Sequence, residues 1–395
     1  MAACFNADPD PWVDVVTAAK NLVPLILAAR DEGEQIRRVP PQVAEALAAA
    51  GLLQMFLPRS MGGPELNPLT VFRAIEEISK ADGSIGWCAM IATAGSLLLG
   101  WLPTDVGRQF CGQPANFRAA GSLRPLGRAY PVDGGYRVRG HFNFASGIDH
   151  ANWLLCTCLV MEGDAPQLTA AGTLRVRAMW LPSGQATIKD TWSVVGLRGT
   201  GSQDFMVDDV FVPAAHSCFI GEPPVEAGPL YHPRPVFVTL FTAVVGNSLG
   251  IARGAIDAFI ELAARESSTR STDLLRDRPL VQSRLAEAEA ILNGARAHVV
   301  DSIGTLWEAV CSDASVPSLA LARARLAIVH AMHEAVRSVD LVFHAAGTNA
   351  IYCRNPLERY FRDIHVAVQH NSAFPAQYES AGEVLMGLSP GDVGW

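Results

Sequence analysis

Residues Trp192–Pro213 read WSVVGLRGTGSQDFMVDDVFVP, and this stretch places a β region in the middle of the chain. Its second half is rich in Val and Phe and ends at a proline, which is typical of a β-strand. Its first half spaces glycines as G-x-x-G-x-G (Gly196–Gly201), between strands rather than from a strand into a helix. The glycines therefore do not predict a dinucleotide-binding or phosphate-binding loop.

Around this stretch, the periodicity divides the chain into three predicted domains. Residues 1–116 repeat apolar side chains at helical spacing. Residues 117–222 change to a period of two and contain an Asp-Gly-Gly turn that predicts a hairpin. Residues 223–395 hold three long apolar helical patterns, which predict a bundle. The sequence thus predicts helices, then strands, then helices.

The composition indicates a compact globular protein and excludes several partners. Of 395 residues, 49% are hydrophobic and 18% are charged, and the net charge of −8 argues against binding to nucleic acid. Eight scattered cysteines without a C-x-x-C pair predict buried free thiols, such as Cys156 and Cys158, in a reducing cytoplasm. The acidic start, Met1–Trp12, does not resemble a signal peptide.

One uncharged segment, Gly83–Pro103, is long enough to cross a membrane. Glycines and serines interrupt it, and no basic flank follows it. These features favour a buried helix over a membrane span, so no membrane partner is predicted.

Two other chemistries lack the residues that they need. His330, His333 and Glu334 lie within one predicted helical turn, but a di-iron bundle needs a second matched Glu-x-x-His helix, so no metal site is predicted. A serine hydrolase is also unsupported, because the chain has no G-x-S-x-G elbow.

The chain resembles the acyl-CoA dehydrogenase superfamily over residues 20–388. The resemblance is carried by EEISKADGSIGW (Glu76–Trp87), by the opening stretch and by AAGTNAIYCRNPLERYFRDIH (Ala345–His365). It implies an α+β fold with an N-terminal helical domain, a central β-barrel or β-sandwich domain and a C-terminal four-helix bundle. Asp133–Trp153 and Arg362–His370 are most similar to two-component flavin-dependent monooxygenases, which hydroxylate phenols, polyketides or heteroatoms.

The position that holds the catalytic base of the dehydrogenases carries no acid here. In that family a carboxylate follows the aspartate of an Arg-Asp pair by eight residues, and counting from Asp363 gives Asn371. The alternative position falls near Leu240. Neither an amide nor an alkyl group can remove a proton next to a thioester. The resemblance therefore implies the family scaffold without its dehydrogenase chemistry.

Two residues are predicted to be catalytic. His370 lies where the similar hydroxylases have a catalytic histidine, and an imidazole can take a phenol proton or assist an oxygen intermediate. Ser146 ends a Phe-Ala-Ser run that corresponds to the Trp-x-Thr run of the dehydrogenases, beside flavin N5. There it would support a flavin C4a-hydroperoxide. A core histidine and a turn serine remain the structural alternatives.

The same resemblance predicts the flavin and substrate contacts. Thr348 and its neighbours form a glycine-rich turn that reaches a neighbouring subunit's cofactor in the superfamily. The predicted cofactor-binding residues are Asn143, Phe144, Ser146, Trp192, Gly199, Thr200, Ser202, Gly347, Thr348 and Asn349. The predicted substrate-pocket residues are Trp87, Cys88 and Asn371.

One departure affects the cofactor. Members that hold FAD tightly have an Arg-x-x-Phe run, whereas Arg265 and Arg270 have no matching phenylalanine. This favours reduced flavin, FMN or FAD, supplied by a separate reductase, with O2 as co-substrate. We expect the oxygenase component of a monooxygenase, a homotetramer acting on an aromatic or other apolar small molecule. The alternatives are an acyl-CoA dehydrogenase with its base elsewhere and a non-catalytic flavin-binding or assembly protein.

Overall fold

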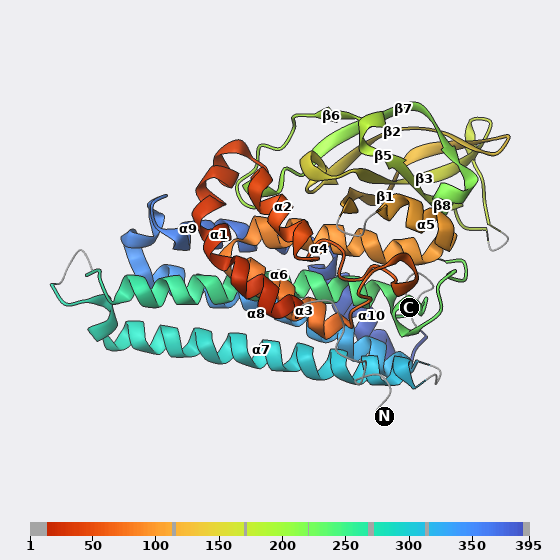
Figure 1. The fold of residues 1–395 in the computed structure, drawn as a ribbon. Coiled ribbons are helices and arrows are strands. Elements are labelled where there is room, and N and C mark those ends of the chain that lie inside the picture. The colour runs from red at the N-terminus through yellow and green to blue at the C-terminus, as the bar shows by residue number, and fades with distance from the viewer. Residues whose placement is uncertain are drawn as a thin grey trace.

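A computed structural model describes residues 14–112, 116–169, 172–219, 221–267, 272–312 and 316–389. Arg270, one of the two arginines considered for flavin, lies outside the described residues. Arg265 is exposed and pairs with Glu261 at 3.3 Å. Figure 1 shows the sheet on one side of the molecule, the helices on the other, and α7 farthest from the sheet. The predicted order of helices, strands and helices is confirmed.

The N-terminal helices begin at polar side chains that cap them. Asn67 accepts the Thr70 N–H at 2.9 Å to start α3, and Asp82 accepts the Ile85 N–H at 2.9 Å to start α4. Asp82 also ends α3, so a single residue sets the corner between the two helices. The helices are α1 (Val15–Ile36), α2 (Pro41–Ala49), α3 (Pro68–Ala81), α4 (Gly83–Leu98) and α5 (Thr104–Cys111).

The uncharged segment that could cross a membrane is a buried helix of this fold. Among the described residues, two helices, Gly83–Trp101 and Val236–Ala263, are long and apolar enough for a span, and 89% of each apolar window is buried by the rest of the protein. The interpretation of Gly83–Pro103 as a buried helix is confirmed. Helix α4 packs on the sheet, where a side chain at Gly95 would put its Cβ 2.5 Å from that of Ala119.

The central domain is one eight-stranded sheet with the order β6-β7-β2-β1-β3-β5-β8 and β4 beside β3. The predicted hairpin joins β1 to β2, with Val132 opposite Gly135. Cys156 and Cys158 are buried in β3, as predicted. The strands are β1 (Ala119–Val132), β2 (Gly135–Ala145), β3 (Trp153–Glu162), β4 (Ala165–Pro166), β5 (Val176–Pro182), β6 (Thr187–Lys189), β7 (Gln203–Pro213) and β8 (Ser217–Cys218).

The C-terminal bundle packs closely against the N-terminal helices at three glycines. Gly246, Gly250 and Gly254 repeat every four residues along α6, and a Cβ at each would lie 2.5–2.8 Å from a carbonyl oxygen of α3. The backbones can approach only because these side chains are absent. The bundle helices are α6 (Val236–Ala263), α7 (Pro279–Cys311), α8 (Ser318–Ala346), α9 (Pro356–Ala367) and α10 (Ala376–Leu385).

Candidate active site

Ser146 lies at the centre of a chain of hydrogen bonds that joins β2, α4 and the loop before β7. Trp87 Nε1 donates to Ser146 Oγ at 3.1 Å. Ser146 Oγ lies 2.6 Å from Ser202 Oγ, which lies 2.7 Å from Thr200 Oγ1. Thr200 Oγ1 donates to the Leu197 carbonyl at 2.9 Å. Four of the predicted site residues, from three separate parts of the sequence, thus form one connected group.

His370 contacts the same tryptophan. Its ring lies edge-on to Trp87 and to Phe241 of α6, with centroid distances of 5.8 Å in both cases. Since Trp87 also bonds to Ser146, this one side chain links the two predicted catalytic residues. Edge-on aromatic rings form an apolar wall that suits a flat aromatic molecule.

The environment of His370 keeps its imidazole neutral. Burial lowers its pKa to about 4. Nδ1 contacts the Ser372 hydroxyl at 2.8 Å and the Ser372 N–H at 3.3 Å, and that hydroxyl also contacts Met332 Sδ at 3.3 Å. Within the described part of the chain, Nε2 has no hydrogen-bond partner. The Ser372 N–H can only donate, so Nδ1 is the acceptor nitrogen, and in the neutral imidazole Nε2 carries the proton and acts as a donor.

Two aromatic side chains, Phe144 of β2 and Trp192 of the loop before β7, lie side by side outside the buried core. Phe144 is 56% exposed, and its ring lies 6.2 Å from that of Trp192 in an edge-on arrangement. Its backbone φ is +59°, a left-handed conformation that is costly for a bulky residue. Strain of this kind clusters at functional sites. Next to Phe144, Asn143 Oδ1 accepts from Arg124 at 3.4 Å.

Helix α9 holds the loop that carries Thr200 and Ser202. The Asp363 carboxylate accepts the Leu197 N–H at 2.5 Å, and Arg362 donates to the Val195 carbonyl at 2.8 Å. Burial raises the pKa of Asp363 to about 7, and the nearby Asp82 carboxylate adds to the rise. The Arg-Asp pair of the sequence therefore has a structural role, which is to fix this loop next to Ser146.

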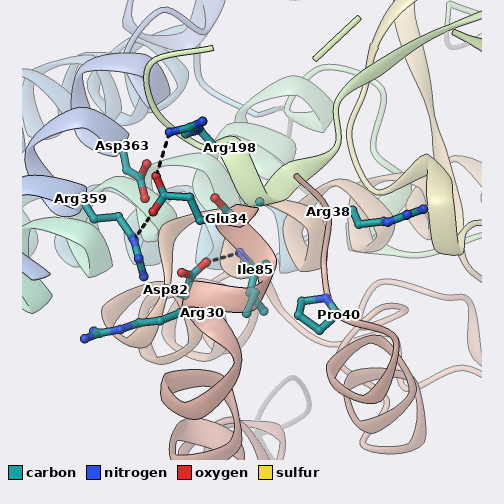
Figure 2. A pocket seen from close by; sticks show the side chains of 12 residues that line it. Arg30, Glu34, Arg38, Pro40, Asp82, Ile85, Arg198, Arg359 and Asp363 are labelled. Carbon is teal, nitrogen blue, oxygen red and sulfur yellow. Dashed lines mark hydrogen bonds and ion pairs between the residues drawn. The ribbon is translucent and has the colours of Figure 1, made fainter. Parts of the chain in front are cut away.

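Around Asp363, charged side chains from distant parts of the chain surround a small pocket (Figure 2). Glu34 of α1 is at its centre and accepts from Arg359 at 2.7 Å and from Arg362 at 2.8 Å, with Arg198 at 3.4 Å. Burial opposes ionisation of Glu34, but the arginines outweigh it and lower the pKa of Glu34. This pocket is an ion network that joins α1, α9 and the loop.

The structure places the remaining predicted site residues in four different environments. Cys88 is buried and donates to the Thr200 carbonyl at 3.4 Å, close to Ser146. Gly199 faces α1 and Ser84 in the charged pocket, and Asn371 is exposed. Gly347, Thr348 and Asn349 lie apart, in a pocket between α7 and α8 that Arg278, Arg284, Arg337 and His344 also line.

Sequence reasoning missed two residues that contact His370. Phe241 is adjacent to Leu240, a position already singled out for the missing base, but a phenylalanine in an apolar helix gives no signal of its own. Ser372 lies two residues after His370, where a serine or threonine can cap its neighbour's side chain. That spacing could have revealed it.

With this geometry, comparison with known proteins identifies the family. The acyl-CoA dehydrogenase N-terminal domain matches residues 16–103, and the acyl-CoA dehydrogenase C-terminal domain matches residues 242–374. The indole-3-acetate monooxygenase of Pseudomonas putida is 33% identical over 91% of this chain and 90% of its own. The chain belongs to the acyl-CoA dehydrogenase superfamily. Within it, the protein is a flavin-dependent monooxygenase that uses reduced flavin.

Two more members of the superfamily show how much of the chain the similarity covers. The flavin-dependent monooxygenase oxygenase subunit HsaA of Mycobacterium tuberculosis H37Rv is 29% identical over 96% of both chains. The crystal structure of 3-HSA hydroxylase from Rhodococcus sp. RHA1 has a TM-score of 0.87 and 28% identity over 96% of this chain and 98% of its own. The predicted fold class and the predicted monooxygenase class are therefore confirmed.

Proposed function

We propose that this protein is the oxygenase component of a two-component system that hydroxylates an aromatic small molecule. The observation that carries the proposal is the position of Trp87, which bonds to Ser146 and lies edge-on to the ring of His370. Both predicted catalytic residues thus contact one side chain, and the Trp87 and Phe241 rings form an apolar wall beside His370.

The residues around Ser146 fit a flavin. The exposed ring of Phe144, with its strained backbone, and the neighbouring ring of Trp192 offer apolar surfaces to a flat ring system. Asn143 adds a polar group, and the backbone of Gly199–Ser202 lies beside Ser146. When bound and reduced, flavin supplies two electrons to O2, so that one oxygen atom enters the substrate and the other leaves as water.

His370 would bind and orient the substrate. Because its imidazole is neutral and Nδ1 accepts the Ser372 N–H, Nε2 would donate a hydrogen bond to a substrate oxygen and stabilise the negative charge that develops there. The N–H and hydroxyl of Ser372 would keep the imidazole ring oriented through Nδ1. Phe241 and Trp87 would press on the faces or edges of the aromatic ring and keep water away from it.

Other parts of the proposal concern partners and location. A separate reductase would supply reduced FMN or FAD, and the protein would act in the cytoplasm as a homotetramer. Exposed apolar side chains next to the Gly347 turn support assembly. They are Leu280 at 64%, Ile351 at 63% and Tyr352 at 48% exposure. In a tetramer this turn would approach the flavin of a neighbouring subunit.

Oxygen isotope labelling tests the proposal. The protein is loaded anaerobically with reduced FMN or FAD and mixed with ¹⁸O2 and a panel of indoles and phenols, including indole-3-acetate. We expect one ¹⁸O atom in a product, and release of peroxide rather than product when no aromatic compound is present. Oxidised flavin bleached by a CoA thioester, with no labelled product, would instead indicate a dehydrogenase.

A further inference from the structure

The direction of every hydrogen bond in the Ser146 chain follows from counting protons. The Leu197 carbonyl can only accept, and Thr200 Oγ1 donates its single proton to it at 2.9 Å, beside the Trp192 Nε1–H, which reaches the same oxygen at 3.1 Å. Ser202 must then donate to Thr200, and its own proton is used in doing so. Ser146 must therefore donate to Ser202, which leaves the Ser146 hydroxyl without a proton for any other partner.

The other end of the chain and its burial support the same direction. The Trp87 N–H can only donate, and it occupies one acceptor position of Ser146. The exposed fractions of Ser146, Ser202 and Thr200 are 3%, 3% and 1%, so water has little access to reverse the chain. Ser146 can offer a new partner only its remaining lone pair.

That lone pair distinguishes the two redox states of a flavin. In reduced flavin N5 carries a hydrogen and donates, whereas in oxidised flavin N5 presents a lone pair and needs a donor. We propose that Ser202 and Thr200 are positioning residues that fix Ser146 as an acceptor, so that the site binds reduced flavin in preference to oxidised flavin. The inference rests on the proposed function, in which Ser146 faces N5.

This preference would suit a protein that receives its flavin from elsewhere. Reduced flavin would gain a hydrogen bond from its N5–H to Ser146. In oxidised flavin, the lone pair of N5 would face the lone pair of Ser146 with no proton between them. A buried acceptor without a donor loses the whole desolvation cost of the group, whereas a satisfied one does not. The chain would therefore help to exchange spent flavin for reduced flavin.

The experiment compares the dissociation constants of oxidised and reduced flavin, FMN and FAD, measured anaerobically on the same preparation. Ser202→Ala and Thr200→Val each free a proton, so that Ser146 can rotate and donate to oxidised N5. We expect the ratio of the oxidised to the reduced constant to fall about tenfold in both variants. The midpoint potential of the bound flavin should fall by about 30 mV, which is a tenfold ratio for a two-electron couple.

Two matched variants test whether the effect comes from the proton count. Thr200→Ser keeps the hydroxyl, and Trp87→Phe removes a donor to Ser146 without freeing its proton. Both should leave the ratio within about twofold of the wild type. Because each ratio compares two ligands on one preparation, a general loss of folded protein cancels out.

The outcomes separate this inference from the proposed function. An unchanged ratio in both Ser202→Ala and Thr200→Val, with both flavin forms still bound, overturns the inference and leaves the monooxygenase proposal standing. A wild type without preference for reduced flavin overturns it too. A wild type that binds no reduced flavin at all overturns the proposed function, and this inference with it.

Discussion

The charged pocket around Glu34 and the aromatic site around His370 differ in how completely their polar groups are satisfied. In the charged pocket, Glu34 pairs with Arg198 and Arg359 (Figure 2), and Arg362 also donates to Glu34. Asp363 accepts the Leu197 N–H, and among the described side-chain atoms of this pocket only Arg359 Nη1 is buried without a partner. In the aromatic site there are few polar atoms, but His370 Nε2 and one lone pair of Ser146 remain available. The comparison teaches that a dense cluster of charges can stabilise a fold, whereas catalysis needs polar groups that still have a donor or acceptor position available for a ligand.

The largest effect expected from this comparison is on catalysis at His370. His370→Gln keeps a polar side chain but cannot exchange a proton as imidazole does, so kcat/KM for the aromatic substrate should fall by about 10²- to 10⁴-fold. Steady-state kinetics with a saturating supply of reduced flavin measures it.

His141→Gln is the control, because His141 is on the exposed side of β2 and pairs with Asp204 at 2.8 Å. It should retain full activity. Equal losses in the two variants, or none in His370→Gln, would return His370 to a structural role.

The second effect is on stability, in the charged pocket. Glu34→Gln removes the carboxylate that Arg359 and Arg362 share. Because Arg359 keeps Asp31 and Arg362 keeps Glu358 as partners, the free energy of unfolding should fall by about 2 kcal/mol. Urea denaturation measures the change. Glu261→Gln removes an exposed partner of Arg265 and should cost less than about 0.5 kcal/mol.

Glu34→Gln also tests whether the charged pocket only stabilises the fold or binds the substrate itself. The folded fraction of Glu34→Gln should keep a KM for the aromatic substrate within about twofold of the wild type. A stable Glu34→Gln protein that has lost its substrate affinity would mean that the charged pocket is itself a binding site.

A smaller effect is expected at the aromatic wall. Phe241→Leu keeps an apolar side chain but removes the ring that faces His370, and an aromatic contact contributes about 0.5–1.5 kcal/mol. The KM for an aromatic substrate should therefore rise by about two- to tenfold, with little change in kcat. A pure loss of kcat would place Phe241 in the chemical step instead of substrate binding.

The smallest effect is a pH dependence of stability. The pKa of His370 is about 4 when folded and near 6.5 when unfolded, so between these values the unfolded state binds more protons. The stability contribution is present above pH 6.5 and is lost as the pH falls toward 4. His370→Gln should lose about 1 kcal/mol less than the wild type between pH 7 and about pH 5.7.

His150 provides an internal check on that measurement. Burial also lowers its pKa to about 4, so a decrease in stability with falling pH should persist in His370→Gln. A His370→Gln curve parallel to that of the wild type would mean that folding does not lower the pKa of His370.

Much of the fold could be predicted because the patterns that carry it are local. The strand after Gly201, the Asp-Gly-Gly hairpin and the long helices depend on neighbouring residues, and periodicity records them directly. The candidate site was found partly by resemblance, which pointed to Ser146 and His370. Phe241 and the ion pairs of Glu34 were missed, because their partners lie more than 100 residues away in the sequence.

The sequence by itself determined the order of helices and strands, the family and the absence of an acid at the position of the dehydrogenase base. Only the tertiary structure decided that Trp87 joins Ser146 to His370, and that Asp363 holds the Leu197 loop rather than acting on a substrate. The physical reason is that a hydrogen bond depends on where two groups meet and on how many protons each can give. Neither is set until distant segments pack together.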